Sequence, residues 1–176
     1  MKKNNSNSGW WIIIYGFSGS GKTQISKRLL YKIKKKYGPT VLFNGDDIRK
    51  IFSLKGYSLK ERSDTALKYC KLAKFITNQN INVIFAVVGM MNTPRNWNKK
   101  NIKNYVEIYI KSDLKTIIKK RKKKIYQIKK ENIVGLDIKP EFPKKPDIII
   151  NNNFKKNIKF YSEELFSKIN IHFKSK

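Results

Sequence analysis

The residues with the clearest chemical potential form a glycine-rich stretch near the start of the chain. It reads Gly16-Phe17-Ser18-Gly19-Ser20-Gly21-Lys22-Thr23 and matches the pattern G-x-x-x-x-G-K-[ST] at every fixed position. Glycines let a backbone curl so that several N–H groups point at one phosphate, and a following helix adds the positive potential of its N-terminus. Lys22 would reach the β- and γ-phosphates, and Thr23 would offer a hydroxyl to Mg²⁺. The stretch predicts a site for ATP and Mg²⁺, formed by Gly16, Ser18, Gly19, Ser20, Gly21, Lys22 and Thr23.

A second group of reactive side chains lies in Asn44-Gly45-Asp46-Asp47-Ile48-Arg49. The carboxylate of Asp46 can hold a magnesium-bound water or accept the proton of a hydroxyl group, and Arg49 can grip an anionic acceptor. Arginine is informative here because only five of the 40 basic residues are Arg, and its planar fork suits phosphate and carboxylate. No other loop resembles a GTPase switch, and no long insertion is typical of an ATP-driven motor. The two groups together predict a small-molecule kinase.

A parallel sheet would bring these groups together. An apolar run predicts a strand over 11–15 that leads into the glycine-rich loop, and a short strand over 40–43 precedes the second group. The nearly unbroken apolar run 81–88 predicts a central strand buried on both faces. Strands alternate with helices, so we expect an α/β fold of the P-loop NTPase type, a parallel sheet flanked by helices, with its working loops at the carboxyl ends of the strands. Further strands are expected at 106–110 and 147–150, and helices at 22–36, around 48–52, at 58–78, within 89–104, at 113–123 and at 162–172.

The length of 176 residues predicts one domain over 10–176, after a polar lead-in over 1–9 that we expect to be disordered. The segment 122–146 is basic, then proline-bearing, and lacks a clean period, which favours a lid over the site. No apolar stretch approaches the roughly 20 residues needed to span a bilayer. The single cysteine, Cys70, lies in a helical pattern and is expected in the core. These features favour a cytoplasmic protein without a membrane partner.

The formal net charge of +28 raises the alternative of a nucleic-acid-binding ATPase. Lys, Asn and Ile are abundant along the whole chain, however, which indicates a general compositional drift rather than a built basic patch. We therefore do not expect nucleic acid to be the specific partner. A degenerate nucleotide binder without activity is a third reading, and the intact Lys22, Thr23, Asp46 and Arg49 argue against it.

Several ordered motifs over residues 10–152 resemble the adenylyl-sulfate kinases. Besides the two groups above, they comprise Gly56-Tyr57-Ser58-Leu59-Lys60-Glu61-Arg62, Arg121 to Tyr126, Ile133-Val134-Gly135-Leu136-Asp137, and Glu141-Phe142-Pro143 before Pro146-Asp147. The resemblance implies transfer of the γ-phosphate of ATP to the 3′-hydroxyl of adenylyl sulfate, with Mg²⁺. It also implies a homodimer, for which the sequence itself offers no indication.

The resemblance also implies roles for individual residues. Asp46 corresponds to the acidic residue that organises Mg²⁺ and acts as base, Arg49 and Arg62 to arginines that hold the acceptor, and Tyr57 to an aromatic residue that stacks on its base. Lys22 joins Asp46 as a catalytic residue, and Thr23 and Asp46 are the expected metal ligands. The acceptor pocket is completed by Thr65, Val88, Gly89, Lys124 and Ile133.

This chain departs from the family pattern mostly around the acceptor. Asn44, Asp47 and Thr65 stand where the family usually has Asp, Asn and Asn. Val88-Gly89-Met90-Met91-Asn92 replaces Ile-Ser-Pro-Tyr-Arg, and Ile133 replaces the second aromatic residue of the base sandwich. We therefore expect no phosphoserine intermediate. A relative acting on another nucleotide, such as a phosphoramidate-type cytidine diphosphate derivative, stays open as an alternative acceptor.

Overall fold

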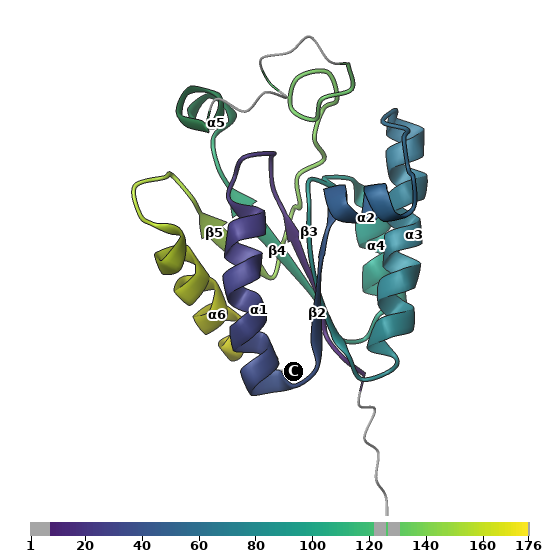
Figure 1. The fold of residues 1–176 in the computed structure, drawn as a ribbon, viewed down its shortest axis with the longest axis vertical. Coiled ribbons are helices and arrows are strands. Elements are labelled where there is room, and N and C mark those ends of the chain that lie inside the picture. Colours follow the sequence, from purple (N-terminus) through teal and green to yellow (C-terminus); the bar gives the residue numbers. More distant parts are fainter. Residues whose placement is uncertain (1–7, 122–125, 127–130, 176) are drawn as a thin grey trace, which may run out of the picture.

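A computed structural model describes residues 8–121, 126 and 131–175. The described strands form one all-parallel sheet in the order β2-β3-β1-β4-β5, with helices on both faces (Figure 1). The predicted α/β class and all five predicted strands are confirmed. The strands are β1 Trp11–Tyr15, β2 Thr40–Asn44, β3 Asn82–Val87, β4 Tyr105–Lys111 and β5 Ile148–Asn151; the helices are α1 Lys22–Tyr37, α2 Gly45–Ile51, α3 Leu59–Thr77, α4 Asn92–Asn101, α5 Leu114–Arg121 and α6 Ile158–Lys174.

β1 lies at the centre of the sheet, and all five of its side chains are buried. Because side chains alternate along a strand, β1 contributes to a separate core on each face. Ile12 and Ile14 join the core under α1 and α6, while Trp11, Ile13 and Tyr15 join the core under α3. A strand buried on both faces is a rigid base for the loop that follows it.

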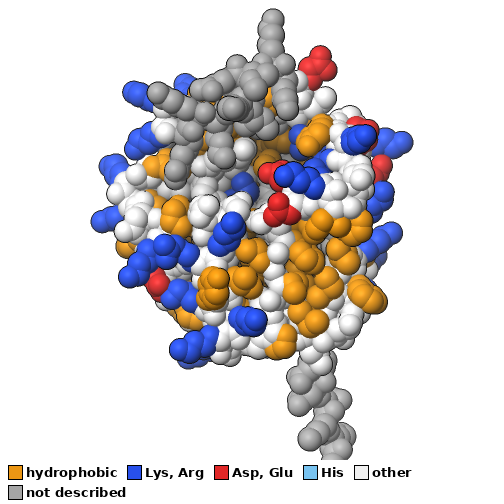
Figure 2. Space-filling model, viewed as in Figure 1, with side chains coloured by type: hydrophobic (Ala, Val, Ile, Leu, Met, Phe, Trp, Pro, Cys, Tyr) orange, Lys and Arg blue, Asp and Glu red, His pale blue; other side chains and the backbone are white. Residues whose placement is uncertain are grey.

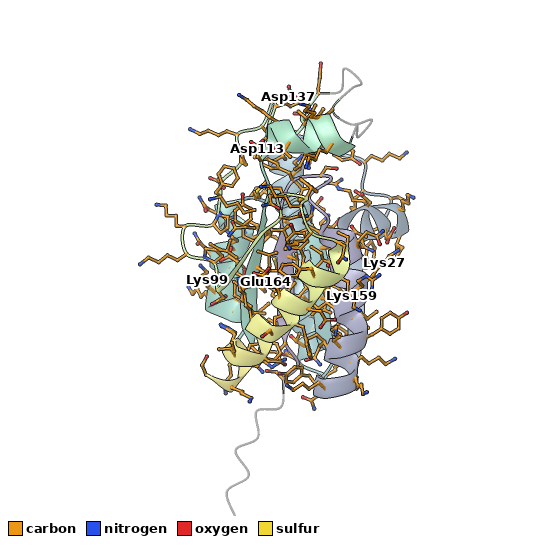
Figure 3. All side chains as sticks on the ribbon, turned by 90° about the vertical axis from the view of Figure 1, so that its left-hand side faces the viewer. Lys27, Lys99, Asp113, Asp137, Lys159 and Glu164 are labelled. Atoms are coloured by element: carbon orange, nitrogen blue, oxygen red, sulfur yellow. The ribbon has the colours of Figure 1, made fainter. Side chains whose placement is uncertain are left out.

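A buried ion pair crosses the α4 side of the sheet. Glu107, in the middle of β4, is 0% exposed, and its Oε1 lies 3.2 Å from Nε of Arg95 on α4. Its Oε2 lies 3.2 Å from Nζ of Lys99, one of the residues labelled in Figure 3. Burial raises the pKa of Glu107, and the charges of Lys99 and Arg95 oppose that rise. Arg95 also donates to the carbonyl of Glu141 at 2.7 Å, so the pair fixes the end of the segment 122–146 against α4.

The ends of several elements differ from the sequence prediction for local reasons. Ser8 and Gly9 are already part of the fold, since Gly9 N donates to the carbonyl of Thr77 at 2.7 Å; the domain begins before the predicted boundary at residue 10. α5 begins at Leu114 rather than at the predicted residue 113, because Asp113 precedes the helix and accepts from Thr116 N at 2.8 Å. α6 begins at Ile158 because Asn157 accepts from Phe160 N, four residues earlier than predicted. The rest of the predicted lead-in lies outside the described residues.

The described helices include none that is both long and apolar enough to cross a membrane. Cys70 is buried on α3, and burial raises the pKa of its thiol to about 12. The predicted core position of Cys70 is confirmed.

Candidate active site

One cleft lies at the carboxyl ends of β1, β2 and β3, where the loops after these strands meet. In the view of Figure 2, acidic and basic side chains lie side by side at the surface near α2. The cleft collects eight of the nine predicted acceptor residues together with four of the seven predicted ATP-binding residues. Its lining comprises Ser18, Gly19, Lys22, Thr23, Asn44, Gly45, Asp46, Arg49, Tyr57, Arg62, Thr65, Ala66, Tyr69, Ala86, Val87, Val88, Gly89, Met91, Tyr126, Ile133 and Val134.

The remaining predicted residues have other positions. Gly16, Ser20 and Gly21 belong to the same glycine-rich loop and shape it without lining the cleft. Gly21 has a φ of 92° at the N-terminus of α1, a conformation that favours glycine. Lys124 lies outside the described residues, so its predicted role stays a prediction.

The side chain of Lys22 stabilises the glycine-rich loop by a hydrogen bond to its backbone. Nζ of Lys22 donates to the carbonyl of Phe17 at 2.7 Å, and the side chain is 7% exposed. Ser20 N donates to the same carbonyl at 3.1 Å, which closes the turn. The ammonium group therefore already lies in the loop, where a bound phosphate would meet it.

Asn152 supports the loop from the carboxyl end of β5. It follows β5, is 1% exposed, and its Nδ2 donates to the carbonyl of Ser20 at 2.9 Å. Its Oδ1 accepts from Phe154 N at 2.9 Å, so both ends of the amide are engaged. The sequence prediction missed this residue because Asn151-Asn152-Asn153 lies in an asparagine-rich chain, where one Asn gives no signal.

Two arginines hold the loop between α2 and α3. Nη1 of Arg49 donates to the carbonyls of Leu54 and Gly56 at 3.0 and 2.8 Å. Nε of Arg62 donates to the carbonyl of Tyr57 at 2.8 Å. Both guanidinium groups lie over the ring of Tyr57, at 4.4 and 5.1 Å from its centroid. Tyr57 is nevertheless 47% exposed, so part of the ring stays open to a ligand.

The position of Arg62 follows from the start of α3. Ser58 and Glu61 form a capping box: Glu61 Oε2 accepts from Ser58 N at 3.0 Å, and Ser58 Oγ accepts from Glu61 N at 3.4 Å. The hydrogen bonds from Ser58 hold the pKa of the Glu61 carboxyl below its usual range. Arg62 is the next residue and projects from this first turn. Burial, followed by the nearby charge of Arg49, lowers the pKa of Arg62.

The segment after α5 contacts the glycine-rich loop at two points. The hydroxyl of Tyr126 donates to the carbonyl of Ser18 at 3.0 Å. A Cβ placed on Gly135 would lie 2.7 Å from the ring of Phe17, so the chain passes too close for a side chain there. Ile133, 6% exposed, begins a tight turn in which its N donates to Asp137 Oδ2 at 2.9 Å. The described residues of this segment therefore lie against the glycine-rich loop, and their role as a lid stays a prediction.

The cleft also contains residues that the sequence prediction did not assign. Asn44 lies two residues before Asp46. Its Nδ2 donates to Asp47 Oδ2 at 2.9 Å, so Asn44 orients the carboxylate of Asp47. Tyr69 and Met91 enter from α3 and from the residue before α4. The helical pattern of this segment does not tell whether Tyr69 lies in the core or in the cleft.

Replacing Arg49 by Lys is expected to raise KM for the acceptor about tenfold and to leave KM for ATP unchanged. Lysine keeps the charge but cannot donate to the carbonyls of Leu54 and Gly56 from one planar group, so the loop that carries Tyr57 would lose its support. Initial rates with each substrate varied in turn would measure both constants. An equal rise of both would contradict an acceptor-side role.

The described residues hold no cluster of three or more His, Cys, Asp or Glu side chains fit for a metal ion. Thr23 and Asp46 both line the cleft and offer one hydroxyl and one carboxylate. This pair fits Mg²⁺, which commonly keeps several waters and takes one or two protein oxygens beside substrate phosphates.

The comparisons with known proteins agree with this geometry. The sequence model of the adenylylsulphate kinase family matches residues 8–151. A cytidine diphosphoramidate kinase of Campylobacter jejuni is 37% identical over 93% of this chain and 98% of its own, and a probable adenylyl-sulfate kinase of Archaeoglobus fulgidus is 28% identical over 81% and 95%. A Mycobacterium tuberculosis APS kinase in complex with AMPPNP and APS has the same fold, with a TM-score of 0.77, 18% identity, and coverage of 93% of this chain and 98% of that one. The chain therefore belongs to the adenylylsulphate kinase family and is a phosphotransferase.

Proposed function

We propose that the protein transfers the γ-phosphate of ATP to the 3′-hydroxyl of adenylyl sulfate, giving ADP and 3′-phosphoadenylyl sulfate. The observation that carries the proposal is the meeting of two residue groups in one cleft. Lys22 and Thr23 come from the first turn of α1, directly after the loop that follows β1, while Asp46 and Arg49 come from α2 and Arg62 comes from α3. This arrangement supports a nucleoside triphosphate and an anionic acceptor bound side by side.

In the proposed reaction, the loop N–H groups and Lys22 bind the β- and γ-phosphates. Asp46 accepts the proton of the acceptor hydroxyl while the oxygen of that hydroxyl forms a bond to the γ-phosphorus. The bond from the γ-phosphorus to the bridging oxygen, which leaves with ADP, breaks. Thr23 and Asp46 would hold Mg²⁺, which when bound neutralises charge on the phosphates. Arg49 and Arg62 would orient the acceptor through the guanidinium N–H groups that do not bind backbone carbonyls.

A cytidine diphosphate derivative of the phosphoramidate type is the second candidate acceptor. It is favoured by the 37% identity to the Campylobacter jejuni enzyme over nearly the full length of both chains. It is also favoured by Ile133, which is buried beside the cleft where the family pattern has an aromatic residue. Both candidates share a nucleotide with an anionic group, and the same donor loop serves either.

Purified protein with ATP, Mg²⁺ and each candidate acceptor should distinguish them. We expect adenylyl sulfate to produce ADP well above the rate without acceptor, with 3′-phosphoadenylyl sulfate as the second product. Turnover with the cytidine nucleotide alone would replace the first candidate by the second. ADP formation that no nucleotide acceptor stimulates would contradict both.

A further inference from the structure

Tyr69 is a cleft residue that none of the proposed steps uses. It lies on α3 and lines the cleft together with Asp46 and Arg49. Tyr69 is 7% exposed. Its ring packs edge-on against Phe85 of β3, with centroids 5.0 Å apart and planes at 86°. The ring is therefore fixed by the core while the residue also faces the cleft.

The hydroxyl of Tyr69 is buried without a hydrogen-bond partner among the described residues. Tyr126 and Tyr161, by contrast, do have a partner: Tyr126 donates to the carbonyl of Ser18, and Tyr161 donates to Asn153 Oδ1. A buried polar group without a partner costs free energy, so native proteins rarely retain one without a use. A ligand that reached this hydroxyl from the cleft would supply the missing acceptor.

Residues proposed to hold the acceptor influence the pKa of this hydroxyl. Burial is the main cause that raises the pKa of Tyr69; Arg49 opposes the rise, and Asp46 and Tyr57 add to it. The phenol therefore stays protonated near neutral pH and can donate a hydrogen bond. Tyr69 lines the same cleft as Arg49, Asp46 and Tyr57, the residues proposed to hold the acceptor.

We propose that the Tyr69 hydroxyl donates a hydrogen bond to an oxygen or ring nitrogen of the acceptor nucleotide and so helps to determine acceptor specificity. The inference rests on the proposed function, because it assumes an acceptor nucleotide in this cleft. A fixed donor of this kind favours a ligand that offers an acceptor atom at that position and disfavours one that would leave the hydroxyl unpaired.

The test is Tyr69→Phe, which removes only the hydroxyl and keeps the ring against Phe85. We expect KM for the acceptor, or Kd measured by calorimetry with ADP in the donor site, to rise about tenfold. KM for ATP should stay unchanged. The midpoint of thermal unfolding should stay the same or rise, because the folded protein loses no internal hydrogen bond.

Tyr161→Phe is the matched control. It removes a hydroxyl that donates to Asn153 at 3.1 Å beside α6, so it should lower thermal stability and leave acceptor KM unchanged. Adenylyl sulfate and the cytidine nucleotide would be compared in parallel. A rise for both assigns the hydrogen bond to the part they share, and a rise for one assigns it to the base or to the anionic group.

The outcomes separate this inference from the proposed function. If the unmodified protein uses and binds neither nucleotide, the proposed function fails. If it uses one and Tyr69→Phe leaves that acceptor constant unchanged, the inference alone fails. Equal increases in both KM values, or a loss of thermal stability, would assign Tyr69 a structural role and overturn the inference.

Discussion

Lys22→Ala is expected to lower kcat about 10³-fold while the protein stays folded. Nζ of Lys22 lies in the glycine-rich loop. In the proposed reaction it is a fixed positive charge beside the γ-phosphate that is transferred. Removing one such preorganised group typically costs two to three orders of magnitude. The hydrogen bond to Phe17 contributes about 1 kcal/mol to folding, which a single domain of this size tolerates.

The measurement is the steady-state rate of ADP formation at saturating acceptor, paired with a thermal unfolding curve. Lys27→Ala is the control, because Lys27 is an exposed lysine of the same helix outside the cleft (Figure 3). Its rate should match that of the unmodified protein. Full turnover by Lys22→Ala would contradict the assignment of the loop.

Asp46→Asn is expected to lower kcat about 10³-fold with little change in KM for ATP. The amide cannot accept the proton of the acceptor hydroxyl, a contribution that typically amounts to 10²–10⁴-fold. Because Asp46 is also a proposed metal ligand, the Mg²⁺ concentration for half-maximal rate should rise. A magnesium titration at saturating ATP and acceptor would measure both effects.

Asp47→Asn provides a matched carboxylate. Asp47 neighbours Asp46 in α2 but does not line the cleft, and its Oδ2 accepts from Asn44. We expect its kcat to stay within a few-fold of that of the unmodified protein. If Asp47→Asn proved the more damaging change, the base would have to be reassigned.

The sequence predicted those parts of the site in which neighbouring residues indicate a single local structure. The glycine-rich loop is recognisable because its fixed positions are contiguous and the flanking strand and helix are strongly patterned. Ser58 and Glu61 predict a helix start because a capping box needs only two residues three apart. The five strands follow from short apolar runs, and β1 was predicted to the residue.

Contacts between distant segments were beyond such reasoning. The hydrogen bonds from Asn152 to Ser20 and from Tyr126 to Ser18 join residues more than 100 positions apart, and neither side chain type announces its partner. The ion pair of Arg95 with Glu107 was not predicted, because Glu107 lies within an apolar strand, where a buried carboxylate is not expected from the pattern. Arg49 was predicted to grip the acceptor, and the structure adds that it supports the α2–α3 loop.

Arg62 links the loop before α3 to the segment after α5. Its Nε binds the carbonyl of Tyr57, and its Nη2 binds the carbonyl of Asn132, at 2.8 Å, just before the turn at Ile133. An acceptor that draws Arg62 toward its anionic group would therefore also pull on the segment that carries Ile133. We expect the two substrates to bind and the two products to leave in a preferred order, because the guanidinium group proposed to hold the acceptor also binds the segment predicted to be a lid.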